Sequence, residues 1–370
     1  MAELQQQKKS VGRLAFIDWT RGLAAIIMLQ GHTFNSFTRT NLRGGGPYML
    51  SQFAGGLPPA IFLLLTGITF AFLMDSKGRE GGTAKTRIWS ALKRSRYLFI
   101  LAFLFRIQMY VTGYPTSPAS EILRVDILNC MGFAMLMFSP LAVLTTIARV
   151  RVSAIVGCLV AGLAPFVSMF NNPQIPALIR AYVVPDYNYF GFFPWASFLA
   201  FGLSLGSILR LLKKEDLERA MLWLMAIGLG VGLLAYYLSN LPYSIYPKSE
   251  FWLDSPGLVA IKLSFVMCLL AVAYLWVHVG GSERWSLFRQ VGTTSLLVYW
   301  VHVELVYGRW FGIWKEAMSV SQVIIYTIVL TVLMTALSVL WTRFKANGSN
   351  IRWSRPRTQQ VPQAQAVAAD

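Results

Sequence analysis

Apolar stretches of about 20 residues, each long enough to cross a bilayer as a helix, recur along the whole chain. Short polar segments separate them. The pattern predicts ten spans, at residues 14–38, 54–74, 90–112, 125–147, 152–170, 190–212, 219–239, 257–279, 289–308 and 321–343. We therefore expect an all-α fold, a polytopic transmembrane helical bundle formed by residues 13–343.

The two ends of the chain lack this pattern. Residues 1–12 are polar, and residues 344–370 are first basic and then rich in Gln, Ala and Pro. Neither end contains enough apolar surface to pack against a folded domain. The sequence predicts a disordered cytoplasmic N-terminus over 1–12 and a disordered basic cytoplasmic tail over 344–370.

The charge distribution predicts how the bundle is oriented. The chain of 370 residues is 55% hydrophobic, which excludes a soluble protein of this size, and its net charge is +17. Of its 33 Lys and Arg residues, 23 fall on one alternating set of loops and ends and 7 on the other. Basic residues accumulate on the cytoplasmic side of membrane proteins, so both termini are predicted to be cytoplasmic. The excess indicates topology and contact with lipids, and no nucleic-acid partner is expected.

Cysteine spacing gives no sign of a metal site or a disulfide framework. Cys130, Cys158 and Cys268 all lie in apolar stretches and have no paired spacing. We expect no bound metal and no bound cofactor.

The first predicted span contains three ionisable residues, in the stretch FIDWTRGLAAIIMLQGHTFNSF. Asp18 and Arg21 are three residues apart and can pair within one helical turn. His32 follows Arg21 by eleven residues, which returns to nearly the same face of a helix about 16 Å further along its axis. The pattern is consistent with a structural ion pair and an interfacial histidine, or with a functional stripe. Ionisable groups at membrane depth favour function by default.

Four stretches resemble one family of membrane enzymes. Arg21 and His32 form an R-x10-H pattern within ID-x-x-RGLA, which resembles the first span of acyltransferase-three proteins. LPPAIFLLLTGITFAF (57–72), FFPWASFLAFGLSLG (192–206) and VGTTSLLVYWVHVELVYG (291–308) are similar to segments of the bacterial branch of heparan-α-glucosaminide N-acetyltransferase catalytic domains. The chain thus resembles the transmembrane acyltransferase superfamily.

This resemblance implies transfer of an acyl group, most simply acetyl, from cytosolic acyl-CoA to a hydroxyl or amine of an extracytoplasmic sugar or glycan. Acetyl-CoA would be a co-substrate rather than a bound cofactor. His32 would be the catalytic histidine, either as a base or as a transient acyl carrier. Arg21 would hold the donor or orient the site, and Asp18 would position Arg21. The bacterial branch implies a multi-pass protein of the inner, or plasma, membrane.

Three further residues are candidates for an acceptor site or for support of the catalytic histidine. His302 matches a late histidine of the resemblance, whereas Glu304 points about 200° away from it on a helix, so both cannot face one partner. Trp195, near the start of its span, can stack on a sugar ring. Residence at the membrane interface is the alternative explanation for all three residues.

Four basic residues are candidates for binding acyl-CoA. Arg94 and Arg96 belong to a basic segment before the third span that can hold phosphates, although cytoplasmic topology alone explains such residues. Arg106 and Lys262 lie deeper, with no Asp or Glu one turn away, so we expect their partners to come from other helices.

A second function is compatible with the same residues. Arg21, Arg106 and Lys262 would also suit the pathway of a transporter or flippase for an anionic solute or a lipid-linked sugar. Consumption of a CoA thioester distinguishes the two hypotheses. The sequence leaves the acceptor, the acyl chain length and the oligomeric state open.

Overall fold

A computed structural model describes residues 15–79, 81–170, 172–280 and 285–351, and these residues confirm the all-α fold. They contain no β-strand. The predicted disordered N-terminus at 1–12 and most of the predicted tail lie outside the described residues. The last helix continues to Ile351, eight residues beyond the predicted end of the final span.

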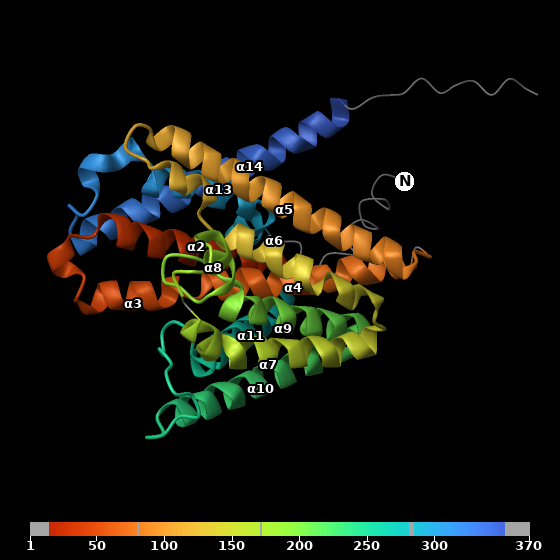
Figure 1. Cartoon of the computed structure of the whole chain (residues 1–370). Coiled ribbons are helices and arrows are strands. Elements are labelled where there is room, and N and C mark those ends of the chain that lie inside the picture. Colours follow the sequence, from red (N-terminus) through yellow and green to blue (C-terminus); the bar gives the residue numbers. More distant parts are fainter. Residues whose placement is uncertain (1–14, 80, 171, 281–284, 352–370) are drawn as a thin grey trace, which may run out of the picture.

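The described helices alternate with short turns. Their bounds are α2 (Ala15–Phe37), α3 (Gly46–Gly55), α4 (Pro58–Arg79), α5 (Ala84–Gly113), α6 (Ile127–Phe138), α7 (Thr146–Met169), α8 (Ala177–Val183), α9 (Phe192–Leu211), α10 (Leu217–Ser239), α11 (Pro256–Gly280), α12 (Leu287–Thr293), α13 (Ser295–Tyr307) and α14 (Val320–Ile351). The long helices run roughly alongside one another, with α10 at one margin and α5 and α14 at the other (Figure 1).

Seven helical segments of the described part are long and apolar enough to cross a membrane. The chain is therefore a multi-pass membrane protein, while the number of ten spans and the cytoplasmic position of both termini remain predictions. Neither α2 nor α5 is among the seven. α2 carries Asp18 and Arg21, and α5 begins with a run of Lys and Arg.

Two predicted spans are not single helices. Within 125–147, α6 ends at Phe138 and a 3₁₀ turn with Pro140 near its start follows, because proline cannot donate the next helical hydrogen bond. Within 289–308, α12 and α13 are separated at Thr294. Ser338 of α14 donates a hydrogen bond to the Gln290 carbonyl at 2.9 Å and bonds the Thr294 hydroxyl at 2.6 Å. These contacts satisfy backbone that the break exposes.

α2 is the central helix of the bundle. Fifteen of its 23 residues are buried. Phe16, Ile17, Trp19 and Ala24 belong to a large apolar core shared with α4, α5, α6, α9 and α11. Ala25, Leu29, Phe34 and Phe37 belong to a second core shared with α12, α13 and α14. The helix that carries Arg21 and His32 thus joins both halves of the interior.

Close contact between glycines brings α12 against the first half of α2. A Cβ atom at Gly22 would overlap the backbone of Phe288 and crowd Gly292, and a Cβ atom at Gly292 would overlap the carbonyl oxygen of Asp18. The two backbones therefore touch directly, as small residues allow in membrane proteins. Gly22 and Gly292 belong to the first and the last of the four family-like stretches.

The other two family-like stretches also pack on each other through glycine. A Cβ atom at Gly67 of α4 would overlap the Leu199 carbonyl, and one at Gly202 of α9 would overlap the Leu64 carbonyl. α4 and α9 are consequently in direct backbone contact. The four stretches thus form two glycine-mediated helix pairs, one of which includes the helix of Arg21 and His32.

Replacing Gly22 with Ala tests the α2–α12 contact. We expect the added methyl group to push the helices apart and to cost about 1–3 kcal/mol of stability, as overpacking of a dense interior does. Gly230→Ala in α10 is the matched control, because nothing lies within 4 Å of its Cβ position. Thermal unfolding of the two purified variants in detergent measures the change in stability that each substitution causes. Equal melting temperatures for the two variants would contradict the contact.

Candidate functional site around His32 and His302

Asp18 and Arg21 form the local ion pair that their spacing predicts. Arg21 Nη1 lies 3.2 Å from Asp18 Oδ1. The Asp18 side chain is 7% exposed and that of Arg21 is 21% exposed. A buried carboxylate needs such a partner, because an uncompensated charge in an apolar interior is costly. The pair also lies next to the Gly22–Gly292 contact, which fixes the backbone on either side of Arg21.

His32 lies near the other end of α2 and contacts a second histidine. Its Nδ1 is 3.1 Å from Nε2 of His302 on α13. The imidazole planes differ by 20° and the ring centroids are 5.2 Å apart, so the rings meet edge to edge rather than face to face. His302 is fully buried at 0% exposure, whereas His32 is half-buried.

The surroundings of the histidine pair hold both rings in place. His302 Nδ1 is 2.7 Å from the backbone carbonyl oxygen of Val298, one turn earlier on α13. The edge of Tyr307 contacts His32, with centroids 5.2 Å apart, and Tyr299 contacts His302 at 6.0 Å. His302 therefore has both nitrogens engaged by protein groups, while His32 uses one within the part of the chain that the structure describes.

A histidine in this position can carry out two kinds of step. An unprotonated imidazole nitrogen can take a proton from a hydroxyl or an amine, or can attack a carbonyl carbon directly. Both steps require one nitrogen that is accessible and not protonated. Among the described residues, no group of three or more His, Cys, Asp or Glu side chains is arranged to hold a metal ion.

Glu304 faces away from the histidine pair, as its offset of two residues predicts. Its Oε1 accepts a hydrogen bond from Trp310 Nε1 at 2.8 Å, and its Oε2 accepts one from Gln108 Nε2 at 3.4 Å. Gln108 in turn accepts a hydrogen bond from Trp300 Nε1. Glu304 is 8% exposed, so its visible role is to tie α5 and the turn after α13 to the helix of His302.

Arg106 finds its partners on other elements, as expected. Its Nε is 3.2 Å from Asp126 at the start of α6, and its Nη1 is 3.5 Å from Glu121 in the preceding 3₁₀ turn. Asp126 also caps α6 by accepting from the backbone N–H groups of Leu128 and Asn129. Arg106 thus fastens α5 to α6 with its charge compensated.

Lys262 and Trp195, two residues that the sequence analysis treats separately, contact each other. The Lys262 ammonium lies 4.8 Å from the centre of the Trp195 indole, within the range of a cation–π interaction. Lys262 Nζ also lies beside Gly56, and the neighbouring Gly55 touches Gly31, the residue before His32. The Lys262 ammonium therefore lies near the place where the end of α3 touches α2, one residue before His32.

Arg94 and Arg96 lie on the exposed side of α5. The Arg94 guanidinium stacks over Tyr97 at 5.3 Å. Arg96 lines a groove of about 550 Å³ whose other walls are mainly apolar, among them Phe99 and Phe103. No lining residue of this groove belongs to α2 or α13, so the groove is separate from the histidine pair.

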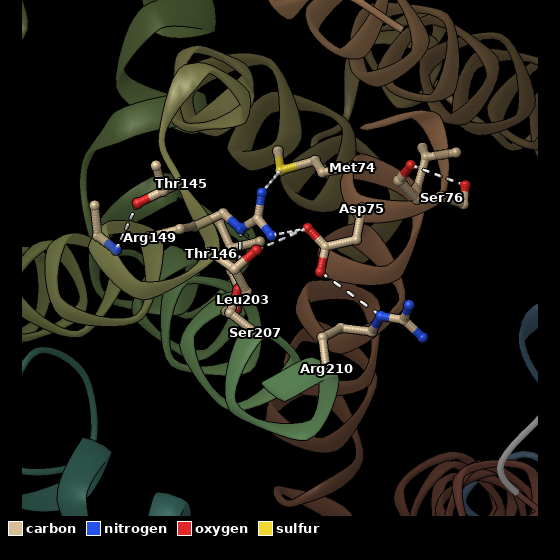
Figure 2. Close-up of polar contacts among 11 residues, drawn as sticks. Met74, Asp75, Ser76, Thr145, Thr146, Arg149, Leu203, Ser207 and Arg210 are labelled. Carbon is tan, nitrogen blue, oxygen red and sulfur yellow. Dashed lines mark hydrogen bonds and ion pairs between the residues drawn. The ribbon is translucent and has the colours of Figure 1, made fainter. Parts of the chain in front are cut away.

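The structure also contains a buried ionic cluster that the sequence analysis does not single out. Arg149 of α7 is 0% exposed and forms an ion pair with Asp75 of α4. Arg210 of α9 approaches the second oxygen of Asp75 at 3.6 Å. Arg149 Nε donates to Ser207 Oγ at 3.0 Å, and Thr146 donates to Asp75 (Figure 2).

Of the buried ionic cluster and the His32–His302 contact, only the cluster had a signal in the sequence. Arg149 and Arg210 count among the 23 basic residues that topology explains, which removed any reason to look for partners. Asp75 was the available signal, because a carboxylate at the end of an apolar stretch needs a cation. For the contact between His32 and His302, which are 270 residues apart, no spacing rule applies.

Residues 13–242 match the family model of heparan-alpha-glucosaminide N-acetyltransferase, catalytic. The match spans more than half of the chain and includes the first three family-like stretches, while 291–308 lies beyond it. It confirms the resemblance to this branch; the R-x10-H pattern remains a prediction. No curated protein matches the chain.

Replacing Arg149 with Met tests the buried ionic cluster. Removal of one partner leaves Asp75 buried with less compensation, and such losses typically cost about 3–5 kcal/mol. Arg151→Met is the matched control, because Arg151 is exposed on the same helix and surface substitutions typically stay within about 0.5 kcal/mol. Thermal unfolding in detergent compares the stability of the two variants. An Arg149→Met protein as stable as the control would show that the cluster does not stabilise the fold.

Proposed function

The chain belongs to the family of heparan-alpha-glucosaminide N-acetyltransferase catalytic domains, and we propose that it transfers an acetyl group from cytosolic acetyl-CoA to a hydroxyl or amine of an extracytoplasmic sugar. His32 is the catalytic histidine of this proposal, and the inner membrane of a bacterium is the proposed location. One observation carries it: the half-buried His32 contacts the fully buried His302 through one ring nitrogen, Nδ1, and its other nitrogen is left for a substrate.

The chemistry needs only one unprotonated nitrogen. His32 takes the proton of the acceptor hydroxyl or amine while the acceptor atom forms a bond to the thioester carbonyl carbon. The carbon–sulfur bond then breaks, and CoA leaves as a thiolate. The proton passes from His32 to the sulfur, so the products are the acetylated acceptor and free CoA, and His32 returns to its neutral form.

Arg21 is the proposed donor-binding residue. It is separated from His32 by about 16 Å along α2, on the side that the charge distribution predicts to be cytoplasmic. A guanidinium binds phosphate oxygens with two parallel hydrogen bonds. An acyl-CoA held there by its phosphates would extend its pantetheine arm along α2 toward His32, with Asp18 keeping Arg21 in position.

Lys262 and Trp195 are the proposed acceptor-binding residues on the other side; Lys262 is assigned to the acceptor rather than to acyl-CoA because it contacts Trp195. Their cation–π contact at 4.8 Å presents an aromatic face and an ammonium donor within one group. Aromatic faces stack on sugar rings, and an ammonium donates hydrogen bonds to sugar oxygens. The contacts through Gly56, Gly55 and Gly31 support a position close to His32.

Substitution of His32 by Ala tests the proposed function. We expect the purified variant to lose release of free CoA from acetyl-CoA, because no other group in the proposal accepts the proton of the acceptor. Removing a positioned acid–base group typically costs about 10²–10⁴-fold in rate. His278→Ala is the control, since His278 stacks on Tyr274 at the end of α11, away from the pair.

The assay uses wild type and both variants in nanodiscs with a panel of amino sugars and simple glycans. Full activity of His32→Ala would exclude His32 as the catalytic residue. Absence of CoA release from folded wild type with every acceptor, together with transport of an anionic sugar, would favour the transporter hypothesis instead.

Substitution of Arg21 by Gln tests the donor side. A charged hydrogen bond contributes about 1.5–3 kcal/mol, so we expect the KM for acetyl-CoA to rise about 10- to 100-fold. Lys248→Gln, in an exposed loop before α11, is the control. Arg94→Gln and Arg96→Gln in the same assay should raise KM less, because both side chains are exposed. An unchanged KM in Arg21→Gln would exclude its role in donor binding.

A further inference from the structure

The hydrogen-bond partners of His302 determine which of its nitrogens carries a proton. Its Nδ1 is 2.7 Å from the Val298 carbonyl oxygen. A carbonyl oxygen only accepts hydrogen bonds, so Nδ1 of His302 must be the donor. In a neutral imidazole the second nitrogen then has no proton. Nε2 of His302 is therefore an acceptor.

This assignment extends to His32. Because His302 Nε2 accepts, the 3.1 Å contact requires that His32 Nδ1 carries the proton and donates it. The 20° angle between the rings and the 5.2 Å between their centroids are consistent with an N–H bond aimed at the in-plane lone pair of the partner. In neutral His32 the unprotonated nitrogen is then Nε2, which lies on the far edge of the ring from His302.

We infer that His302 is a positioning residue that holds His32 in the Nδ1–H tautomer and reserves Nε2 for the substrate. The catalytic part of this inference rests on the proposed function. The tautomer assignment rests on the hydrogen-bond geometry alone. An unrestrained neutral histidine populates both tautomers, and only the one with unprotonated Nε2 can act on a group on that side. Val298, by fixing His302, indirectly fixes His32.

A neutral partner suits this location better than a carboxylate. In many hydrolases an aspartate holds the catalytic histidine, but it remains charged. At membrane depth a carboxylate without a cation is costly. Glu304, two residues away on α13, is bonded instead to Trp310 and Gln108 and does not face His32. The pair therefore fixes a tautomer without placing a net charge beside the reacting nitrogen.

Nitrogen NMR of histidine rings tests the tautomer directly. The chain has three histidines, so ring-labelled protein gives three sets of signals, and His278→Gln assigns one of them. We expect His32 of the wild type to be in the Nδ1–H form. A His32 protonated at Nε2 in neutral wild-type protein would overturn the inference, whatever the activity of the protein.

Two substitutions of His302 separate positioning from packing. Gln can present an amide oxygen near the place of Nε2, whereas the shorter Asn reaches only the place of Nδ1. We expect His302→Asn to release His32 into mixed tautomers and to lower kcat about 10- to 100-fold with an unchanged KM for acetyl-CoA, an effect of the size seen when the partner that orients a metal-binding histidine is lost. His302→Gln should recover most of the rate and the Nδ1–H signal.

The outcomes also separate this inference from the proposed function. If His302→Asn leaves the His32 signals as in the wild type, the positioning role is wrong even if acetyl transfer occurs. If the wild type shows the Nδ1–H tautomer and the variants shift it as expected, the positioning role stands even if no acetyl transfer is found. Melting temperatures of both variants verify that they fold.

Discussion

The contact between Gly22 and Gly292 is the constraint on which the site depends. It lets the backbones of α2 and α12 touch, and this closeness carries the following helix, α13, along the second half of α2. His302 then comes within 3.1 Å of His32. The break at Thr294, where Ser338 of α14 bonds the Thr294 hydroxyl, separates α12 from α13, and both helices pack against α2. The backbone contact between Gly22 and Gly292 at one end of α2 thus positions His302 to contact His32 at the other end.

The bundle accommodates charged groups in its apolar interior by pairing them. Asp18 pairs with Arg21, Asp75 with Arg149, and Arg106 with Asp126. Each charge has an opposite charge nearby, which limits the cost of burial. The histidine pair follows a different rule, because two neutral rings need only complementary hydrogen bonds. His32 differs from these structural groups in having a second ring nitrogen that its partner does not use.

Features that depend on residue spacing within one helix could be predicted from the sequence. Helical periodicity predicted the Asp18–Arg21 pair and the opposite directions of His302 and Glu304, and the lack of nearby carboxylates predicted partners on other helices for Arg106. Contacts between distant segments were beyond these rules. Neither the His32–His302 contact nor the Lys262–Trp195 contact has a spacing signal. The break within 125–147 had a signal in Pro140. The break within 289–308 had none, because the residue that satisfies the interrupted backbone, Ser338, lies on the distant helix α14.

The central claim is that Nε2 of His32 takes the proton of the acceptor while the acceptor attacks a thioester that reaches the site from the Arg21 side of α2. The most direct test is an electron cryo-microscopy structure of the protein in nanodiscs with an acetyl-CoA analogue that cannot transfer its acyl group. We expect phosphate density beside Arg21 and the acyl carbonyl next to the edge of His32 that faces away from His302. An acyl group bound elsewhere, or phosphates bound only along the α5 groove, would contradict it.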